Sequence, residues 1–160
     1  MRIFLAAWLA LAVIAPTLAR ADSSVPSAAG AAPVMVTLER TACYGRCPIY
    51  KVTILRDGTV RWEGERFVKT TGKATAKLPA TAMSELAKAF ARAGFFALQD
   101  KYERYDVTDN PSAIVSFDDG ARKKTIRHYY GDTSAPKGLY ELEERIDQIA
   151  GTARWVGKQR

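Results

Sequence analysis

Four segments of this chain alternate apolar and polar residues with a period of two, and no other feature limits the fold as strongly. They span residues 34–39, 49–55, 59–65 and 113–117, and a less regular extended stretch covers 67–78. Side chains of a strand point alternately to its two faces, so each alternating segment predicts a strand that is buried on one face only. Strands with one polar face do not form a buried parallel sheet. We therefore expect an α+β fold with a mainly antiparallel sheet of five to six strands and two helices packed on one face.

Two Asp-Gly dipeptides predict the turns between strands. Asp57-Gly58 should form a type I′ turn, in which both central residues have positive φ. Asp119-Gly120 precedes a return strand over residues 122–130. Both hairpins connect neighbouring antiparallel strands, in agreement with the sheet expected above.

Helical periodicity follows Pro79 and Pro136, and a glycine near each expected end, Gly94 and Gly151, can take the left-handed conformation that ends a helix. The expected apolar faces are Met83, Leu86, Ala87 and Phe90 in the first helix, and Leu139, Leu142, Ile146 and Ile149 in the second. Glu141 and Arg145 have the spacing of a supporting ion pair on the surface of the second helix.

The first 21 residues have the pattern of a secretory signal peptide. A short positive start is followed by an apolar run over residues 3–15 and by Ala19-Arg20-Ala21, a typical cleavage signal. The apolar run is shorter than the roughly 20 residues of a membrane-spanning helix. We expect a mature chain that begins at Asp22, has no transmembrane segment and is exported to the periplasm or the extracellular space.

The exported chain should consist of a flexible Ala/Ser/Pro tether over residues 22–33 and a single domain over residues 34–156. The full sequence carries 24 Lys and Arg against 17 Asp and Glu, a formal net charge of +7. Nucleic acid is not an expected partner outside the cytoplasm, so an envelope protein or an anionic envelope component is the expected partner of this basic chain. We expect a monomer without a cofactor.

The only two cysteines, Cys43 and Cys47, are four positions apart with a glycine between them. In an oxidising compartment such a pair is well placed to form a structural disulfide. Two alternatives use the same sulfurs, either as a redox-active pair or as ligands of copper(I) with His128 as the third donor. The structural interpretation of His128 places it at the edge of the core, on the strand face that also carries Ile126 and Tyr130.

The cysteine segment also carries a resemblance. The string from Cys43 to Tyr50, the Asp57-Gly58-Thr59-Val60 turn, Phe95-Phe96, Thr108-Asp109-Asn110-Pro111, and Ile146-Asp147 with Trp155 resemble the family known as domain of unknown function 6438. The likeness covers about residues 34–156. It implies an exported bacterial protein, and it brings no established activity, substrate or catalytic residue.

Six residues are candidates for binding: Tyr44, Arg46, Thr108, Asp109, Tyr129 and Tyr130. Mixtures of Tyr and Arg are frequent on recognition surfaces, although Tyr at the edge of a strand is also a routine packing residue. Thr108 and Asp109 have an alternative role as turn residues that accept hydrogen bonds from the backbone.

The sequence contains none of the short motifs that mark a hydrolase nucleophile, a zinc protease or a phosphate-binding loop. We therefore expect a non-enzymatic binding or envelope-interaction module that uses either the loop after Gln99 or the polar face of the sheet. The residues expected on that face are Lys51, Thr53, Arg61 and Glu63. The alternatives are the thiol or copper protein and a hydrolase with an unrecognised site near His128 or Asp109.

Overall fold

The computed structural model describes residues 32–104 and 108–158, so the expected signal peptide and almost all of the expected tether lie outside the described residues. The strands are β1 (Val34–Arg40), β2 (Ile49–Leu55), β3 (Thr59–Arg66), β4 (Gly72–Lys77), β5 (Lys101–Tyr102), β6 (Ser112–Asp118) and β7 (Lys123–Tyr129). The helices are α1 (Ala80–Arg92), α2 (Lys137–Ala150) and α3 (Ala153–Val156), with a short 3₁₀ turn η1 (Phe95–Ala97) after α1. Within the described ranges no helix has the length and apolar character needed to cross a bilayer.

All seven strands belong to one sheet in the order β4-β3-β2-β1-β6-β7-β5. Every neighbouring pair is antiparallel except β5 and β7, which are parallel. The α+β class is therefore confirmed, while the sheet is mixed and has one strand more than the expected maximum of six. The additional strand, β5, is only two residues long and too short to show a periodic pattern.

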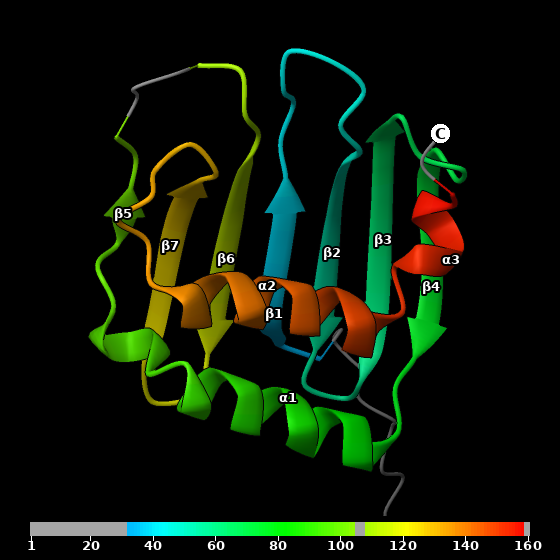
Figure 1. Cartoon of the computed structure of the whole chain (residues 1–160). Helices are drawn as coiled ribbons and strands as arrows, with labels where there is room; N and C mark the ends of the chain where they lie inside the picture. The colour runs from blue at the N-terminus through cyan, green and yellow to red at the C-terminus, as the bar shows by residue number, and fades with distance from the viewer. Residues whose placement is uncertain (1–31, 105–107, 159–160) are drawn as a thin grey trace, which may run out of the picture. The chain divides into compact units, whose positions relative to one another are not determined.

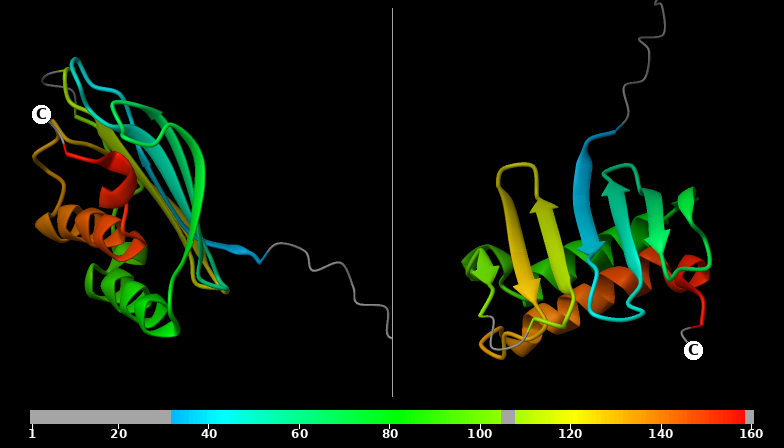
Figure 2. Two further views of the ribbon diagram at one scale, coloured as in Figure 1. Left: turned by 90° about the vertical axis from the view of Figure 1, so that its right-hand side faces the viewer. Right: turned by 90° about the horizontal axis from the view of Figure 1, so that it is seen from above.

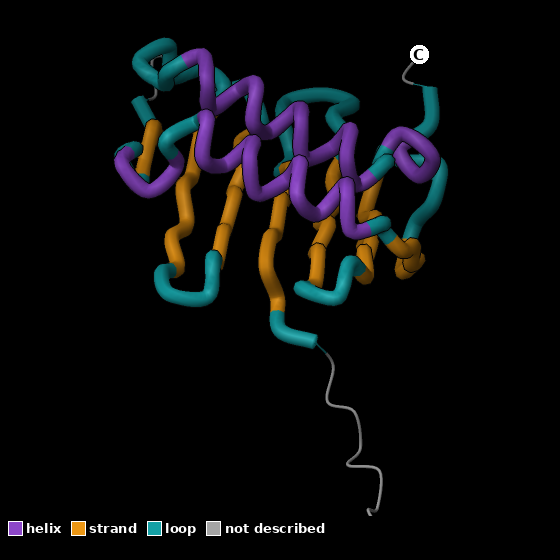
Figure 3. Tube along the Cα trace, turned by 90° about the horizontal axis from the view of Figure 1, so that it is seen from below, coloured by secondary structure: helices purple, strands orange, loops and turns teal. Residues whose placement is uncertain are grey.

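Helices α1 and α2 lie on the same face of the sheet (Figure 1). The edge-on view in Figure 2 shows both of them on one side, and among the described residues no helix covers the opposite face. Figure 3 shows α1 and α2 side by side across the strands. One face of the sheet therefore supplies the core and the other remains polar, as the alternating pattern predicts.

The core forms where the inward positions of the strands meet the apolar stripes of the helices. The stripe of α1 consists of Leu86, Ala89 and Phe90, and Ala87 is exposed, so its assignment to the apolar face was wrong. Ala89 has the favourable spacing because it is three residues from Leu86, whereas Ala87 follows Leu86 directly and points about 100° away.

In α2 the buried positions are Leu139, Leu142, Glu143, Ile146 and Ala150. Ile149 is only partly buried. The expected pair of Glu141 with Arg145 does not form, because Glu141 pairs with Lys137 and Arg145 pairs with Glu85 of α1. The presence of α1 beside α2 gives Arg145 a partner that the sequence of α2 alone does not indicate.

The Asp57-Gly58 hairpin also differs in detail from its prediction. Gly58 has a φ of 82°, but Asp57 does not have positive φ, so the turn is not type I′. A carboxylate oxygen of Asp57 accepts a hydrogen bond from the backbone N–H of Thr59 at 2.9 Å. The connection over residues 56–58 ends in a left-handed glycine, as in three-residue hairpin loops.

Three loops meet at the upper end of the sheet in Figure 1. They connect β1 to β2, lead into β6, and connect β7 to α2. The backbone N–H of Tyr44 in the first loop donates to the carbonyl of Asp109 in the second at 3.0 Å. The N–H of Tyr130 in the third donates to the carbonyl of Pro111 in the second, also at 3.0 Å. The fold thus joins the cysteine loop to two segments that are far from it in sequence.

Candidate functional site

The pairing register places one row of residues across the sheet just below these loops. Tyr50 of β2 is the partner of Arg40 of β1, Arg40 is the partner of Ala113 of β6, and Ala113 is the partner of His128 of β7. All four residues are buried. Because β1 alternates strictly, Arg40 follows Val36 and Leu38 onto the face that the helices cover. The row therefore brings a guanidinium, a phenol and an imidazole into the core.

Helix α2 supplies the opposite charges. Glu143 and Asp147 are four residues apart and so lie on the same face of the helix. Glu143 is fully buried and Asp147 is partly exposed. This face lies over the row, so Arg40 and the two acids meet between the sheet and α2. Buried charges of this kind are stable only when they are paired.

Arg40 and Asp147 form the centre of the cluster. Nη2 and Nε of Arg40 donate to Oδ2 of Asp147 at 2.8 and 3.3 Å. The other oxygen, Oδ1, accepts a hydrogen bond from the hydroxyl of Tyr50 at 2.8 Å and another from the hydroxyl of Thr152 at 2.8 Å. The carboxylate of Asp147 thus accepts four hydrogen bonds, which uses about all of its lone-pair positions.

A second group of contacts surrounds Glu143. Nδ1 of His128 lies 2.9 Å from Oε1 of Glu143, and the hydroxyl of Tyr130 donates to Oε2 at 2.7 Å. Nη1 of Arg40 lies 3.7 Å from Oε2 of Glu143 and connects the two groups. We call these seven residues, with Thr152 included, the polar cluster: Arg40, Tyr50, His128, Tyr130, Glu143, Asp147 and Thr152.

The electrostatics of the cluster affect the protonation of Arg40 and Tyr50. Burial by itself lowers the pKa of Arg40, but the electrostatic interactions with Asp147, Tyr50 and Glu143 and the hydrogen bond to Asp147 together more than compensate, so the pKa of Arg40 lies above its ordinary value. Burial, together with the negative charge of Asp147, raises the pKa of the Tyr50 phenol above its ordinary value. At neutral pH Arg40 is therefore charged and Tyr50 is protonated.

A cleft of about 540 Å³ opens directly above the polar cluster. We call it the cluster cleft. Its floor includes Arg40, Tyr50 and Asp147, and its wall residues include Cys47, Pro48, Pro111, Tyr130, Glu144 and Val156. The volume lies within the range of sites that bind small ligands or single side chains.

One half of the disulfide, Cys47, lies in the wall of this cleft. Cys43 and Cys47 are bonded through their sulfurs, and their Cα atoms are 5.8 Å apart. The bond closes the loop between β1 and β2, and Cys47 and Pro48 then lead directly into β2 and to Tyr50. The disulfide therefore fixes the approach to the floor of the cluster cleft.

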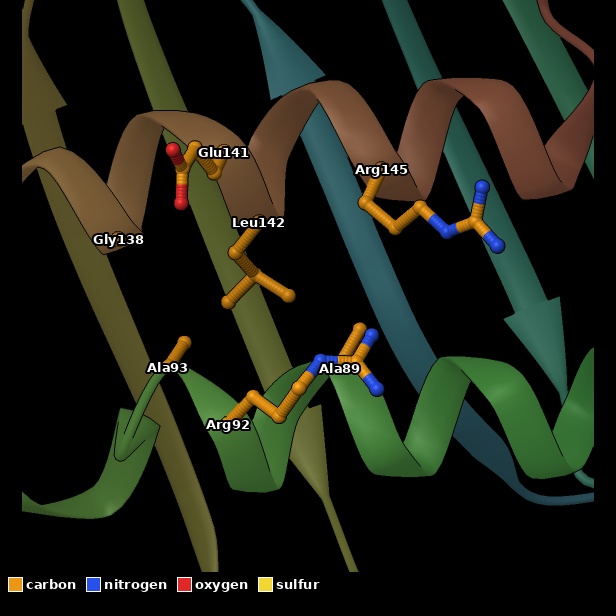
Figure 4. Close-up of a pocket in the computed structure, with 7 residues that line it drawn as sticks. All are labelled: Ala89, Arg92, Ala93, Gly138, Glu141, Leu142 and Arg145. Carbon is orange, nitrogen blue, oxygen red and sulfur yellow. The ribbon is translucent and has the colours of Figure 1, made fainter.

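A different hollow of about 300 Å³ lies between α1 and α2. Figure 4 shows Leu142 pointing from α2 toward α1, with Arg92 and Arg145 extending along the rim. Its base consists of Leu142 and the small side chains of Ala89 and Ala93, and no buried polar group faces into it. This hollow is a consequence of helix packing and lacks the convergent polar groups of the cluster cleft.

The structure divides the candidate binding residues among several places. Tyr130 lies in the wall of the cluster cleft, and Tyr44 lies in the cysteine loop with 90% of its surface exposed. Arg46 packs over Phe67, with its guanidinium carbon 5.5 Å from the ring centre. Thr108 and Asp109 are exposed in the loop before β6. Tyr129 is buried, on the opposite face of β7 from His128.

The three residues of the copper alternative lie in two different environments. Cys43 and Cys47 are joined in the disulfide at the upper end of the sheet. His128 has no exposed surface and contacts Glu143 in the core. In the part of the chain that the structure describes, no group of three or more His, Cys, Asp or Glu side chains is arranged to hold a metal ion.

A comparison with protein-family models matches residues 34–150 to the family described as Domain of unknown function (DUF6438). The chain belongs to this family. The resemblance seen in the sequence is thereby confirmed, and the matched segment holds nearly all of the polar cluster. A comparison with curated proteins found no match. Several residues of the strings that carry the resemblance line the cluster cleft in this DUF6438 domain: Cys47, Pro48, Tyr50, Pro111 and Asp147.

Arg40, Glu143 and Asp147 are site residues of the DUF6438 domain that were not predicted from its sequence. Two signals could have found them. Arg40 continues the inward alternation of Val36 and Leu38, so the pattern predicts that its charged side chain faces the core. Glu143 is four residues after Leu139 and therefore lies within the apolar stripe of its helix. A charge in an inward position requires a partner, which each of these residues supplies for the other.

The raised pKa of Tyr50 predicts a loss of stability at high pH. The folded protein holds the phenolic proton more tightly than the unfolded chain does, so this contribution is fully present below about pH 10 and is lost as the pH rises above it. Between about pH 9 and about pH 11, the free energy of unfolding should fall more steeply for the wild-type protein than for Tyr50→Phe. Urea denaturation at several pH values measures both slopes. Tyr44→Phe, at an exposed position, should keep the wild-type slope, and equal slopes for wild type and Tyr50→Phe would contradict the prediction.

Removal of the disulfide should lower stability moderately and leave the fold intact. For so short a loop, chain entropy predicts a loss of about 2 kcal/mol in the double variant Cys43→Ser/Cys47→Ser. The sheet should persist because β1 and β2 remain paired from Val36 with Ile54 to Arg40 with Tyr50. Urea denaturation gives the loss and circular dichroism tests the fold. Treatment of the wild-type protein with a reductant should reproduce the loss, and the same treatment should leave the double variant unchanged.

Proposed function

We propose that this DUF6438 protein is an exported, non-enzymatic binding module, and that the cluster cleft receives a basic side chain of a partner protein. The observation that carries the proposal is that the carboxylate on the floor of the cleft has all of its hydrogen-bonding positions occupied. Asp147 already accepts four hydrogen bonds from Arg40, Tyr50 and Thr152. A floor of this kind is rigid and shaped for recognition.

The same contacts favour binding over catalysis. A general base must reach the proton that it removes, and the lone pairs of Asp147 are already occupied. His128, the only histidine in the sequence, has no exposed surface from which to contact a substrate. These features support a module that recognises a ligand without changing it.

The chemistry of the walls supports a ligand with an apolar stem and a positive end. Pro48, Pro111 and Val156 offer apolar contact along the cleft. The carboxylate of Glu144 stands at the rim with 67% of its side chain exposed; one of its oxygens accepts a hydrogen bond from Arg40 at 3.3 Å, and Arg40 is paired more closely with Asp147 at 2.8 Å. A lysine or arginine side chain matches this combination, because its methylene stem packs against apolar surface while its charged end stays at a polar rim.

Two features support export. The sequence begins with the pattern of a signal peptide, and the cysteines are joined in a disulfide, which is typical of oxidising compartments. Mass spectrometry of the protein purified from the cell envelope should find a mature chain that begins at Asp22. A chain that retains Met1 and fractionates with the cytosol would refute this part of the proposal.

The cleft is tested with a defined probe. N-acetyl-arginine methylamide, added to the mature protein, should shift the amide resonances of Thr152 and Ala153, and N-acetyl-glutamate methylamide should not. Glu144→Gln should weaken the response, whereas Glu141→Gln, on the same helix but outside the cleft, should leave it unchanged. Equal responses to the basic and acidic probes, or no response to either, would refute the cleft as the site.

A photocrosslinking experiment in the native cell extends the test to the partner. A benzoylphenylalanine at Ala153, an exposed residue of the cleft wall, should give a discrete adduct that Glu144→Gln diminishes. The same probe at Arg61, on the uncovered face of the sheet, is the matched control and should not give that adduct. Identical adducts from both positions would contradict a role for the cleft.

A further inference from the structure

A second cavity, of about 410 Å³, lies on the other side of α3 from the cluster cleft. Its lining includes Arg46, Phe67, Lys69, Val156 and Lys158. Val156 and Gly157 line both cavities, so the end of α3 separates them. We call the second cavity the basic pocket, and the proposed function above does not use it.

The walls of the basic pocket are held together by backbone hydrogen bonds. The N–H of Lys69 donates to the carbonyl of Val156 at 3.0 Å, and the N–H of Thr70 donates to the carbonyl of Trp155 at 2.9 Å. The indole N–H of Trp62 in the core donates to the carbonyl of Thr70 at 2.9 Å. The connection between β3 and β4 is therefore fixed against α3, and the pocket is a built feature of the fold.

Phe67 occupies an unusual conformation in this connection. It has a φ of 55°, and within the described ranges it is the one non-glycine residue with positive φ. Bulky side chains rarely adopt this conformation, and such strain is concentrated at functional sites. The conformation places a ring that is 38% exposed between two guanidinium groups, those of Arg46 at 5.5 Å and Arg66 at 5.8 Å from the ring centre.

The charges around the pocket have one sign. Arg46, Lys69 and Lys158 line it, and no Asp or Glu does so among the described residues. None of these three cations forms an ion pair within residues 32–104 and 108–158. Arg66, beside the ring of Phe67, pairs with its exposed neighbour Glu65 at 3.6 Å. Positive charge of this density lowers the energy of a bound anion.

We propose that the basic pocket binds a phosphate group carried by an organic molecule. Guanidinium groups hold phosphate oxygens through paired hydrogen bonds, and ammonium groups add positive charge. The exposed ring of Phe67 offers apolar contact to the organic part of the ligand, which favours a phosphate ester over the free ion. The guanidinium of Arg46, which lines the pocket, is already held at this ring, so less side-chain entropy is lost when the ligand binds.

Binding to the mature protein is measured with three probes: inorganic phosphate, glycerol 3-phosphate, and phosphatidylcholine vesicles that contain phosphatidylglycerol. Glycerol 3-phosphate should shift the amide resonances of Lys69 and Gly157 and should bind more tightly than inorganic phosphate. If both glycerol 3-phosphate and the anionic vesicles bind, the pocket recognises the phosphate ester itself, whether a soluble molecule or a lipid carries it. Binding of only one of them assigns the phosphate to that source, and vesicles of phosphatidylcholine alone give the background.

Two variants in the pocket and one outside it make the test specific. Arg46→Gln and Lys69→Gln should each weaken binding by at least about tenfold, because each removes a charge-assisted contact to the phosphate. Arg61→Gln removes the same charge from an exposed position on the uncovered sheet face and should change binding by less than about twofold. Equal losses in all three variants, or no binding of any phosphate probe, would overturn the proposal. Neither result would affect the cluster cleft, whose probe is cationic.

Discussion

Replacing Asp147 with alanine should lower the free energy of unfolding by about 3 to 5 kcal/mol, because Arg40 then remains buried without its main counter-charge. In the wild-type protein Nη2 of Arg40 lies 2.8 Å from Oδ2 of Asp147. The hydroxyl groups of Tyr50 and Thr152 lose their acceptor in the same variant. Urea denaturation at neutral pH measures the loss.

An exposed ion pair of the same type provides the control. Arg145 of α2 lies 2.7 Å from Glu85 of α1, with much of both side chains in solvent. Glu85→Ala should therefore cost less than about 1 kcal/mol. A loss in Asp147→Ala that is no larger than the loss in Glu85→Ala would show that the polar cluster does not stabilise the fold.

A double variant separates the net contribution of the ion pair to stability from the free-energy cost of a buried charge that has lost its partner. Arg40→Met/Asp147→Leu removes both charges and keeps most of the buried volume. Its loss of stability should be smaller than that of Asp147→Ala, because no unpaired charge remains in the core. This result would indicate that the main role of the pair is to fix the geometry of the cleft floor, and that its net contribution to stability is smaller.

The second large effect is expected at Trp62. Its indole ring is fully buried and is stacked between Tyr50 of β2 and Trp155 of α3, with ring centres 4.7 and 5.3 Å away. Trp62→Ala should lower the free energy of unfolding by about 3 to 5 kcal/mol, since it opens a cavity and removes the hydrogen bond from the indole to the carbonyl of Thr70. Urea denaturation measures the loss.

Trp62→Phe should lose less stability than Trp62→Ala, because a ring still fills part of the space. Tyr44→Ala is the control at an exposed aromatic residue and should change stability by no more than about 0.5 kcal/mol. A loss below about 1 kcal/mol in Trp62→Ala would contradict the view that this stack holds α3 against the sheet. Since α3 separates the cluster cleft from the basic pocket, Trp62→Ala should also weaken the binding of the arginine probe to the cleft and of glycerol 3-phosphate to the pocket.

Much of the architecture of this DUF6438 domain follows from local patterns. The alternating segments became β1, β2, β3 and β6, and the two periodic segments after Pro79 and Pro136 became α1 and α2. The short elements β5 and α3 were missed because two and four residues are too few to show a period. Of the extended stretch expected over residues 67–78, only Gly72–Lys77 forms a strand, β4, because Phe67 and the residues after it bend toward α3.

The candidate site was harder to predict because its parts come from distant segments. The sequence singled out His128, Tyr130 and the cysteine loop, but it did not connect them to Arg40 or Asp147. Arg40 and Asp147 are 107 positions apart. Their contact depends on the pairing register of the sheet and on the position of α2 across it, and neither is encoded in a local period.

Local patterns in the sequence are enough to place the four alternating strands and the two long helices, to assign most of their apolar positions, and to pair the two sulfurs. That Tyr50, Arg40 and His128 share one row beneath Glu143 and Asp147 depends on the tertiary fold. The physical reason is that periodicity assigns a side chain to a face, whereas its neighbours on that face are chosen by long-range strand pairing and by helix packing. A buried charge in the alternating pattern shows that a partner exists, and the fold decides which residue it is.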